Sequence, residues 1–283
     1  MMQCRKFQPA PDLAPWLAQG WEWRLGHPQP MPEIFPGTGA EILFNLGAPL
    51  TITILSSADL HRTITILSSA DLHRTVTVAT GVAVLLCPRH ARLRFAAHGQ
   101  THLLGLRLRS SACFDLFGVP LEQLSDRVLS LDELGIVCPD PQWLMQEGAG
   151  ALGAWLRQQV ARCPPRDLAL VRAIERLYYG TPAIELQQQL GMSARTFQRR
   201  LRSHLGVDAR YFLRTARFQR ALRQLLSGAP SLDALLEQGY CDQPHFIKSC
   251  HFFTGRSPGQ LLTPEHRRLN HYSPQINRPA GSL

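Results

Sequence analysis

The sequence has little lysine, no paired cysteine motif and no long apolar run. Of its 30 basic residues only Lys6 and Lys248 are lysines, so arginine supplies almost all of the positive charge. The seven cysteines are scattered and form no C-x-x-C pair, which argues against a disulfide framework and against a zinc cluster. No apolar run approaches the roughly 18 residues that span a bilayer, and the first seven residues lack the apolar stretch of a signal peptide. We therefore expect a cytoplasmic protein with reduced thiols and no membrane association.

The positive charge is confined to one half of the chain. Residues 1–160 hold 12 basic and 13 acidic residues, whereas residues 161–283 hold 18 and 8. A length of 283 residues predicts about two domains. A basic domain beside a neutral one is typical of a protein that binds a polyanion. A solvated arginine-rich surface is the simpler alternative, but it does not explain the asymmetry.

The basic half contains two similar helix-turn-helix patterns. In the first, a short apolar helix over residues 184–190 stops at Gly191, which suits a left-handed turn. Ser193 then caps a second helix over residues 194–202. A second helix of this type enters the major groove of DNA.

The second pattern repeats this order further along the chain. A helix over residues 231–238 stops at Gly239, and Asp242 begins a helix that runs to Phe253. A single helix over residues 208–227 joins the two units and carries five arginines. We expect most of them at phosphates or in solvent and at least one in a structural ion pair. If both units face one side of a duplex, their sub-sites lie about 10 bp apart.

The candidate DNA-reading residues lie off the buried side of each second helix. Phe197 and Leu201 are four residues apart and predict the buried stripe of the first. Arginine pairs with guanine through two hydrogen bonds, and glutamine pairs with adenine in the same way. The DNA-contacting residues that we predict are Arg195, Gln198, Arg199 and Arg202 in the first unit, and Gln243, His245 and Lys248 in the second. The alternative is that these residues are surface groups or phosphate contacts.

The N-terminal half predicts short strands. They are residues 41–47, 51–55, 75–78, 82–87, 93–96 and 102–108, with turn residues between them. Such spacing indicates a small barrel or sandwich. Apolar residues between Trp143 and Val160 recur at helical spacing, and Cys163-Pro164-Pro165-Arg166 breaks that pattern.

A 12-residue segment is duplicated without change. Residues 51–62 and 63–74 have the same sequence, and residues 75–78 resemble the start of a third copy. An added strand would reverse the direction in which residues 75–78 arrive, so the sheet can keep only one copy in its original pairing. We expect the other copy to be looped out and to affect sensing rather than DNA contact.

These motifs resemble the AraC/XylS family of transcription regulators over Asp167 to Thr263. The matching positions are Gly191-x-Ser193-x-x-x-Phe197-x-Arg199-x-Leu201, Gly206, Tyr211, Arg217, Ala221, Leu225-Leu226, Gly239-Tyr240-x-Asp242-Gln243-x-His245-Phe246-x-Lys248 and Gly255-x-Ser257-Pro258. Lys248, Cys250 and Pro244 stand where the family usually has arginine, phenylalanine and a small polar residue. We expect Cys250 to pack in the core as a small apolar residue.

The N-terminal half is similar to a cupin-like sensor domain of these regulators. The likeness rests on residues 36–47, 103–108, 117–120 and 126–134. The resemblance implies an α+β protein with a sensor domain (1–160), a linker (161–166), an all-α double helix-turn-helix domain (167–263) and a flexible tail (264–283). It implies double-stranded DNA, a small-molecule effector and, as for an activator, RNA polymerase as partners, with no cofactor and no catalytic residue. A homodimer through the N-terminal half stays open, as do the effector and the sign of regulation.

Two other classes of function compete with a regulator. A cupin-type metalloenzyme would need ligands such as His90, His98 and His102, but these lack the usual H-x-H pairing. A DNA-alkylation repair protein would need a cysteine cluster around zinc, which residues 87–90 do not supply. A purely architectural DNA binder would not need the neutral N-terminal half. That half instead offers Phe44, Leu46, Phe95 and Leu106, which line an effector pocket or are simply core residues.

Overall fold

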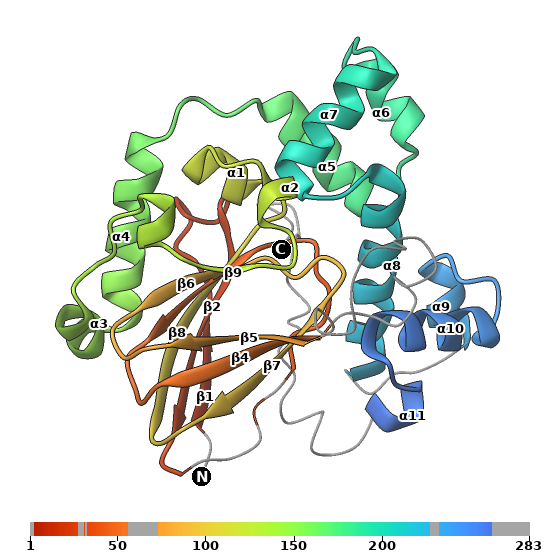
Figure 1. The fold of residues 1–283 in the computed structure, drawn as a ribbon. Coiled ribbons are helices and arrows are strands. Elements are labelled where there is room, and N and C mark those ends of the chain that lie inside the picture. Colours follow the sequence, from red (N-terminus) through yellow and green to blue (C-terminus); the bar gives the residue numbers. More distant parts are fainter. Residues whose placement is uncertain (1–2, 28–30, 32, 56–72, 227–231, 262–283) are drawn as a thin grey trace.

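The computed structural model describes residues 3–27, 31, 33–55, 73–226 and 232–261 of the chain. Strands dominate the first half of the sequence and helices the second, as Figure 1 shows. The expected α+β class, β-rich and then all-α, is therefore confirmed. Among the described residues, no helix combines the length and the apolar character needed to cross a bilayer.

The N-terminal half contains two antiparallel sheets. A six-stranded sheet has the order β1-β2-β8-β3-β6-β9, and a three-stranded sheet has the order β5-β4-β7. The strands are β1 (Gln3–Phe7), β2 (Leu17–Leu25), β3 (Glu41–Asn45), β4 (Leu50–Leu55), β5 (His73–Val78), β6 (Ala83–Leu86), β7 (Arg92–Ala97), β8 (Thr101–Leu108) and β9 (Val128–Ser130). Strands occur at every predicted site, and β1, β2 and β9 are additional to the prediction.

The six-stranded sheet is covered on both faces. Along β3, Ile42 and Phe44 point into a core shared with the helices, whereas Leu43 points into a core between the two sheets. Every residue of β3 is buried, as expected for a strand that is covered on both sides. Trp21 of β2 crosses directly over Gly105 of β8, where a Cβ would come within 2.0 Å of the indole ring.

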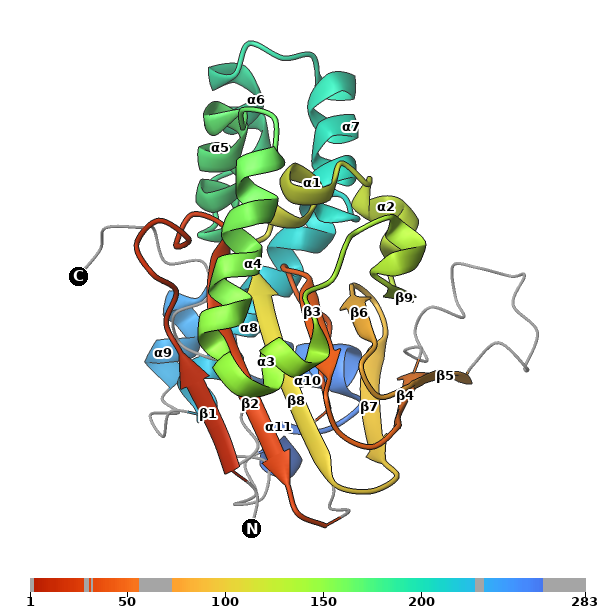
Figure 2. The same ribbon diagram turned by 90° about the vertical axis from the view of Figure 1, so that its left-hand side faces the viewer.

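Helices cover one face of this sheet and lead into the C-terminal half. They are α1 (Ala112–Phe117), α2 (Leu121–Leu124), the 3-10 helix η3 (Asp132–Leu134), α3 (Pro141–Glu147) and α4 (Ala149–Arg162). Figure 2 shows α4 lying across β1, β2 and β8. Trp155 of α4 meets Phe44 edge-on at 5.5 Å, and its indole N–H donates to the Val137 carbonyl. Helix α4 continues through Arg162, so the extended connection begins at Cys163.

The C-terminal half is entirely helical where it is described. It contains α5 (Leu168–Tyr178), α6 (Ala183–Gln189), α7 (Ala194–Leu205), α8 (Ala209–Leu226), α9 (Leu232–Glu237), α10 (Gln243–Thr254) and α11 (Pro258–Leu261). Helix α8 runs between two groups of helices, α5–α7 and α9–α11 (Figure 1). The predicted flexible tail, residues 264–283, lies outside the described residues.

The predicted pocket residues do not share one cavity. Phe44, Leu46 and Leu106 belong to the core under the helices, whereas Phe95 belongs to the core between the two sheets. The pocket prediction is therefore wrong and the core alternative is right. Alternating side chains on a strand point to opposite faces, and which face each strand presents depends on its partners.

The first copy of the duplicated segment supplies β4, which pairs directly with β5. Thr51 to Leu55 pair in antiparallel register with Thr77 to His73. The strand-like part of the second copy, residues 63–67, lies outside the described residues. The two strands are thus joined by a connection of 17 residues, from Leu55 to His73.

Deleting one copy is expected to stabilise the protein. The deletion of residues 63–74 retains both strand sequences, because His61-Arg62 replaces His73-Arg74, and it shortens the connection to five residues. Loop-closure entropy predicts a gain of about 1 kcal/mol in the free energy of unfolding. Thermal denaturation measures the change, and a third copy should lower stability by about half that amount. A deletion that lowers the melting temperature would show that residues 56–72 contribute contacts of their own.

Candidate nucleic-acid interface

The first helix-turn-helix unit is built on a compact apolar core. Phe197 and Leu201 of α7 pack with Leu186 of α6 and Leu177 of α5, so the predicted buried stripe is confirmed. Gly191 has the left-handed φ of +60° at the turn between α6 and α7. The Ser193 side chain caps α7 by accepting from the backbone N–H of Thr196, as predicted.

The second unit repeats this construction on its own core. Phe246, Cys250 and Phe253 of α10 pack against Phe218 of α8, whose ring stacks on Phe253 at 4.7 Å. The Asp242 side chain caps α10 by accepting from the N–H of His245 at 2.7 Å. Burial raises the pKa of the Cys250 thiol to about 12, and this residue packs in the core as expected.

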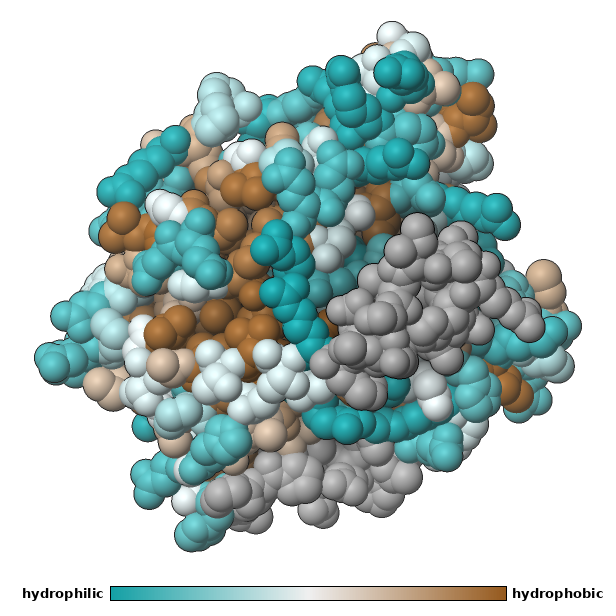
Figure 3. Space-filling model, viewed as in Figure 1, coloured by the Kyte–Doolittle hydropathy of each residue, from teal (hydrophilic) through white to brown (hydrophobic). Residues whose placement is uncertain are grey.

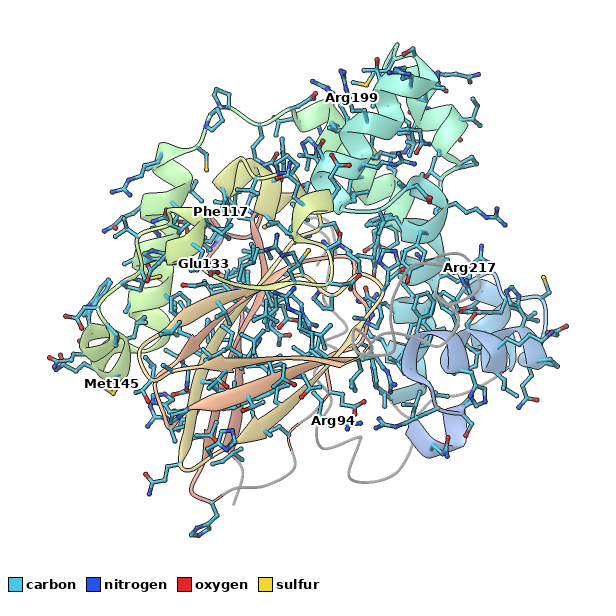
Figure 4. All side chains as sticks on the ribbon, in the orientation of Figure 1. Arg94, Phe117, Glu133, Met145, Arg199 and Arg217 are labelled. Atoms are coloured by element: carbon cyan, nitrogen blue, oxygen red, sulfur yellow. The ribbon has the colours of Figure 1, made fainter. Side chains whose placement is uncertain are left out.

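The predicted DNA-contacting residues of α7 share one face of the helix. Because an α-helix turns about 100° per residue, Gln198, Arg202, Arg195 and Arg199 occupy one continuous arc away from the core. Arg195, Arg199 and Arg202 are exposed, and Gln198 is half-buried. Figure 4 shows Arg199 on the outer part of α7. Arg200 lies outside this arc and pairs with Asp167 at 2.6 Å.

The predicted DNA-contacting residues of α10 differ in how exposed they are. Gln243 is the first residue of the helix and is exposed, as is Lys248. His245 is half-buried, with its ring edge-on to Tyr240 at 5.0 Å. Lys248 therefore projects furthest from the core, whereas His245 has a neighbour that fixes its orientation.

A cationic groove lies between the two units. It has a volume of about 460 Å³, and its lining includes Gln198 of α7, His245 of α10 and Arg210, Arg214 and Arg217 of α8. None of the described residues that line it is acidic. The groove brings one predicted DNA-contacting residue from each unit to the same side of α8. Figure 3 shows that apolar surface gathers over the N-terminal half.

The arginines of α8 contact both units, and they also contribute positive charge to the groove. The Arg214 guanidinium lies 3.5 Å above the Phe252 ring, and that of Arg217 lies 5.9 Å from Tyr240 (Figure 4). Arg220 donates to the Tyr178 carbonyl of the first unit and to the Gln238 side chain of the second. Arg223 is buried and donates to the Tyr178 hydroxyl. Arg220 and Arg223 thus have structural roles, and their partners here are a carbonyl, an amide and a hydroxyl rather than the carboxylate of the expected ion pair.

The N-terminal half packs on the first unit. Helices α1 and α2 contact α7, and the Ser125 hydroxyl donates to the Gly206 carbonyl at the end of α7. Gly206 has a φ of +77°, and a Cβ there would come within 2.5 Å of the Ser125 oxygen. His204 of α7 lies 3.5 Å from Asp115 of α1, which also pairs with Arg166 at 2.7 Å.

Asp126 organises the loop between β6 and β7 that faces α8. Its carboxylate accepts from three consecutive backbone N–H groups, those of Arg89, His90 and Ala91, each at 2.8 Å, and from the His90 ring. Tyr211 of α8 donates its hydroxyl to the Arg89 carbonyl. Burial opposes ionisation of Asp126, but the hydrogen bonds from His90 and Ala91 outweigh it and lower the pKa of Asp126.

The histidines considered as metal ligands are dispersed. His90 contacts Asp126, His98 bonds to Thr51 at 2.5 Å, and His102 bonds to Glu22 at 3.0 Å. Within the described parts of the chain, no three His, Cys, Asp or Glu residues come together as a metal site. Each of these histidines has a separate structural partner.

Two family profiles match the chain. Residues 186–263 match a family described as a helix-turn-helix domain, and residues 5–130 match a domain of unknown function, DUF6597. No curated protein matches. The matched helix-turn-helix segment contains both predicted reading helices and the groove between them.

The chain is similar to several solved structures at low identity. ToxT from Vibrio cholerae is 10% identical, with 92% of this chain and 97% of that chain covered and a TM-score of 0.45. ToxT bound to (E)-4-(8-methylnaphthalen-1-yl)but-3-enoic acid is also 10% identical, with 92% of this chain and 98% of that chain covered and a TM-score of 0.46. A cupin superfamily protein from Desulfitobacterium hafniense is 11% identical over 38% of this chain and 77% of that chain, with a TM-score of 0.27.

The fold and the profile match define a DNA-binding transcription regulator. Two capped helix-turn-helix units on one connecting helix constitute its DNA-binding part. The profile match over residues 186–263 agrees with the resemblance of this segment to the AraC/XylS family.

Replacing Asp126 tests the loop that it organises. An asparagine would tolerate the φ of +58° at this position, but it removes the charge that the backbone N–H groups and His90 stabilise, so Asp126→Asn should cost about 1–3 kcal/mol at pH 7. Because the pKa is lowered in the folded state, this stabilisation is present above about pH 4 and disappears as the pH falls through the folded-state value. Urea denaturation of both proteins between pH 7 and pH 3 should show the difference shrinking with acid. Asp12→Asn, which removes an exposed pair with Arg157, is the matched control.

Proposed function

We propose that the chain reads a bipartite DNA sequence with α7 and α10 in successive major grooves. The observation that carries this proposal is the cationic groove, in which Gln198 and His245 face the same side of α8 among three arginines. A DNA backbone between two major grooves is a polyanion that runs between the two reading helices. A groove whose described lining is cationic and free of acidic side chains complements it.

The contacts divide by residue type and position. Arg195, Gln198 and Arg199 are proposed to read base edges, because their side chains suit guanine and adenine in the major groove. Arg202, which is nearest the C-terminal end of α7 among these four residues, and Lys248 are proposed as contacts of mixed base and phosphate character. Gln243 and His245 are proposed as the readers of the second unit.

The domain organisation follows the same proposal. Residues 1–160 form the sensor, residues 161–166 the linker, residues 167–263 the DNA-binding domain and residues 264–283 the tail. A small-molecule effector is proposed to act through the contact of α1 and α2 with α7, since that contact joins the N-terminal half to a reading helix.

Two protein partners belong to the proposal. RNA polymerase is the partner that an activator requires. A second copy of the chain is proposed to bind at the N-terminal half through α3 and the segment before it, where Val137 is 70% exposed, Met145 47% and Trp143 37%. Such exposure of large apolar side chains is typical of an interaction surface.

Arg199→Ala is expected to weaken specific DNA binding by about 1–3 kcal/mol and to relax sequence preference at one position. The measurement is a gel-shift series on a selected binding site and on its single-base variants. Arg172→Ala is the matched control, since it removes the same charge from an exposed position on α5. An equal loss on every sequence would instead make Arg199 a phosphate contact.

Met145→Glu is expected to shift the chain towards the monomer in analytical ultracentrifugation, because it adds a charge to the exposed apolar surface of α3. Leu168→Glu changes an apolar residue on α5 that is 59% exposed, more than Met145, and serves as the control. Equal sedimentation of the wild type and Met145→Glu at all concentrations would contradict the proposed dimer surface.

A further inference from the structure

One short loop of the N-terminal half contacts the ends of both reading helices. The loop joins β6 to β7 and carries Arg89, and Arg92, three residues further on, is the first residue of β7 directly after it. Arg89 Nε donates to the carbonyl of Leu205, and Arg92 Nη1 donates to the carbonyl of Thr254, each at 2.6 Å. Leu205 is the last residue of α7, and Thr254 is the last residue of α10.

The two helix ends have the same local structure. Each is followed by a left-handed glycine, Gly206 with a φ of +77° and Gly255 with a φ of +68°. The last carbonyls of an α-helix have no partner within the helix, and they form the negative end of its dipole. A guanidinium supplies both the missing donor and the complementary charge. Arg89 and Arg92 therefore cap equivalent positions on the two helices.

The Arg89 cap is buried and held from several sides. The residue is 1% exposed, and its Nη1 donates to the carbonyls of Gly37 and Gly39. The hydroxyl of Tyr211 donates to the Arg89 carbonyl, and the rings of Tyr211 and His90 lie 4.5 Å apart. The loop thus contacts α7 through one side chain and the first turns of α8 through its backbone.

The Arg92 cap is partly exposed and belongs to an ion-pair group that crosses between the two halves. Glu33 lies 3.6 Å from Arg92, 3.2 Å from Arg256 beyond α10, and 3.0 Å from Arg94. Arg92 also lies against Gly255, where a Cβ would come within 3.3 Å of the guanidinium. Arg94 is on the same strand and pairs with the same carboxylate, and its side chain is 55% exposed.

We propose that this loop is a double helix cap that fixes α7 and α10 relative to one another, so that it determines which separation of two DNA sub-sites the protein accepts. Arg89 and Arg92 are positioning residues, since they act on DNA through the helices that they hold. This inference rests on the proposed function, because it requires both helices to read DNA. It also gives the sensor half a direct route to DNA selectivity, because β6 and β7 begin and end the loop.

The test uses the full-length protein and the binding site selected by the wild type, with 1 or 2 bp inserted between the sub-sites. An insertion of 2 bp turns one sub-site by about 70° relative to the other, so the wild type should lose about 100-fold in affinity. Arg92→Ala should lose only about tenfold or less on the same insertion, because the cap no longer holds α10 to one position. Arg92→Lys keeps a cationic donor and should restore much of the wild-type preference. Arg94→Ala, which changes the neighbouring arginine on the same carboxylate, should keep the wild-type profile.

The outcomes separate this proposal from its alternatives. If Arg92→Ala has a lower melting temperature but the same spacing profile as the wild type, the cap is only a stabilising contact and the inference is wrong. If Arg92→Ala does not fold, Arg92→Gln, which is neutral and shorter, takes its place with the same expectation. If the wild type selects no sequence at all, the proposed function fails, which is a different result from an unchanged spacing profile.

Discussion

The arrangement of the DNA-binding half depends on one helix that is buried by two separate cores. Phe212 and Ala216 of α8 complete the core of the first unit, and Phe218 and Leu222, each six residues further along, complete that of the second. Each unit has too few residues to bury a core alone, so each needs α8. Because an α-helix is stiff over this length, α8 fixes the distance between α7 and α10. The arginines of α8 reinforce this by bonding to Tyr178 on one side and Gln238 on the other.

The N-terminal half adds a second constraint at the opposite ends of the reading helices. Three of its hydrogen bonds fall on the carbonyls of Leu205, Gly206 and Thr254, at the ends of α7 and α10 furthest from their capped N-termini. These three bonds lie outside the exposed arc of α7 that carries Arg195, Gln198, Arg199 and Arg202. The loop between β6 and β7, residues 87–91, is shaped in turn by Asp126, whose carboxylate accepts from three consecutive backbone N–H groups of this loop.

The sequence predicted the helical half more accurately than the β-rich half, for a physical reason. Helix patterns are local: Ser193, Gly191 and the Phe197–Leu201 spacing each report on neighbours within a few residues. Strand pairing is not local. The sequence of β2 does not suggest a strand, because it contains Gly20 and the charged residues Glu22 and Arg24, yet β2 pairs along its length with β8. Phe95 was grouped with Phe44 because both are apolar, but the sheets send them into different cores.

The sequence by itself determined the two capped helix pairs, the charge asymmetry and the residues of α7 that face away from the core, because each follows from spacing and residue type within one segment. Only the tertiary structure decided that Gln198 and His245 share a groove and that Arg220 and Arg223 turn inward. It alone brought Arg89 and Arg92 to the ends of two helices more than a hundred residues away. Those contacts join segments that are distant in the chain, and no local pattern of residues specifies which distant carbonyl a guanidinium will meet.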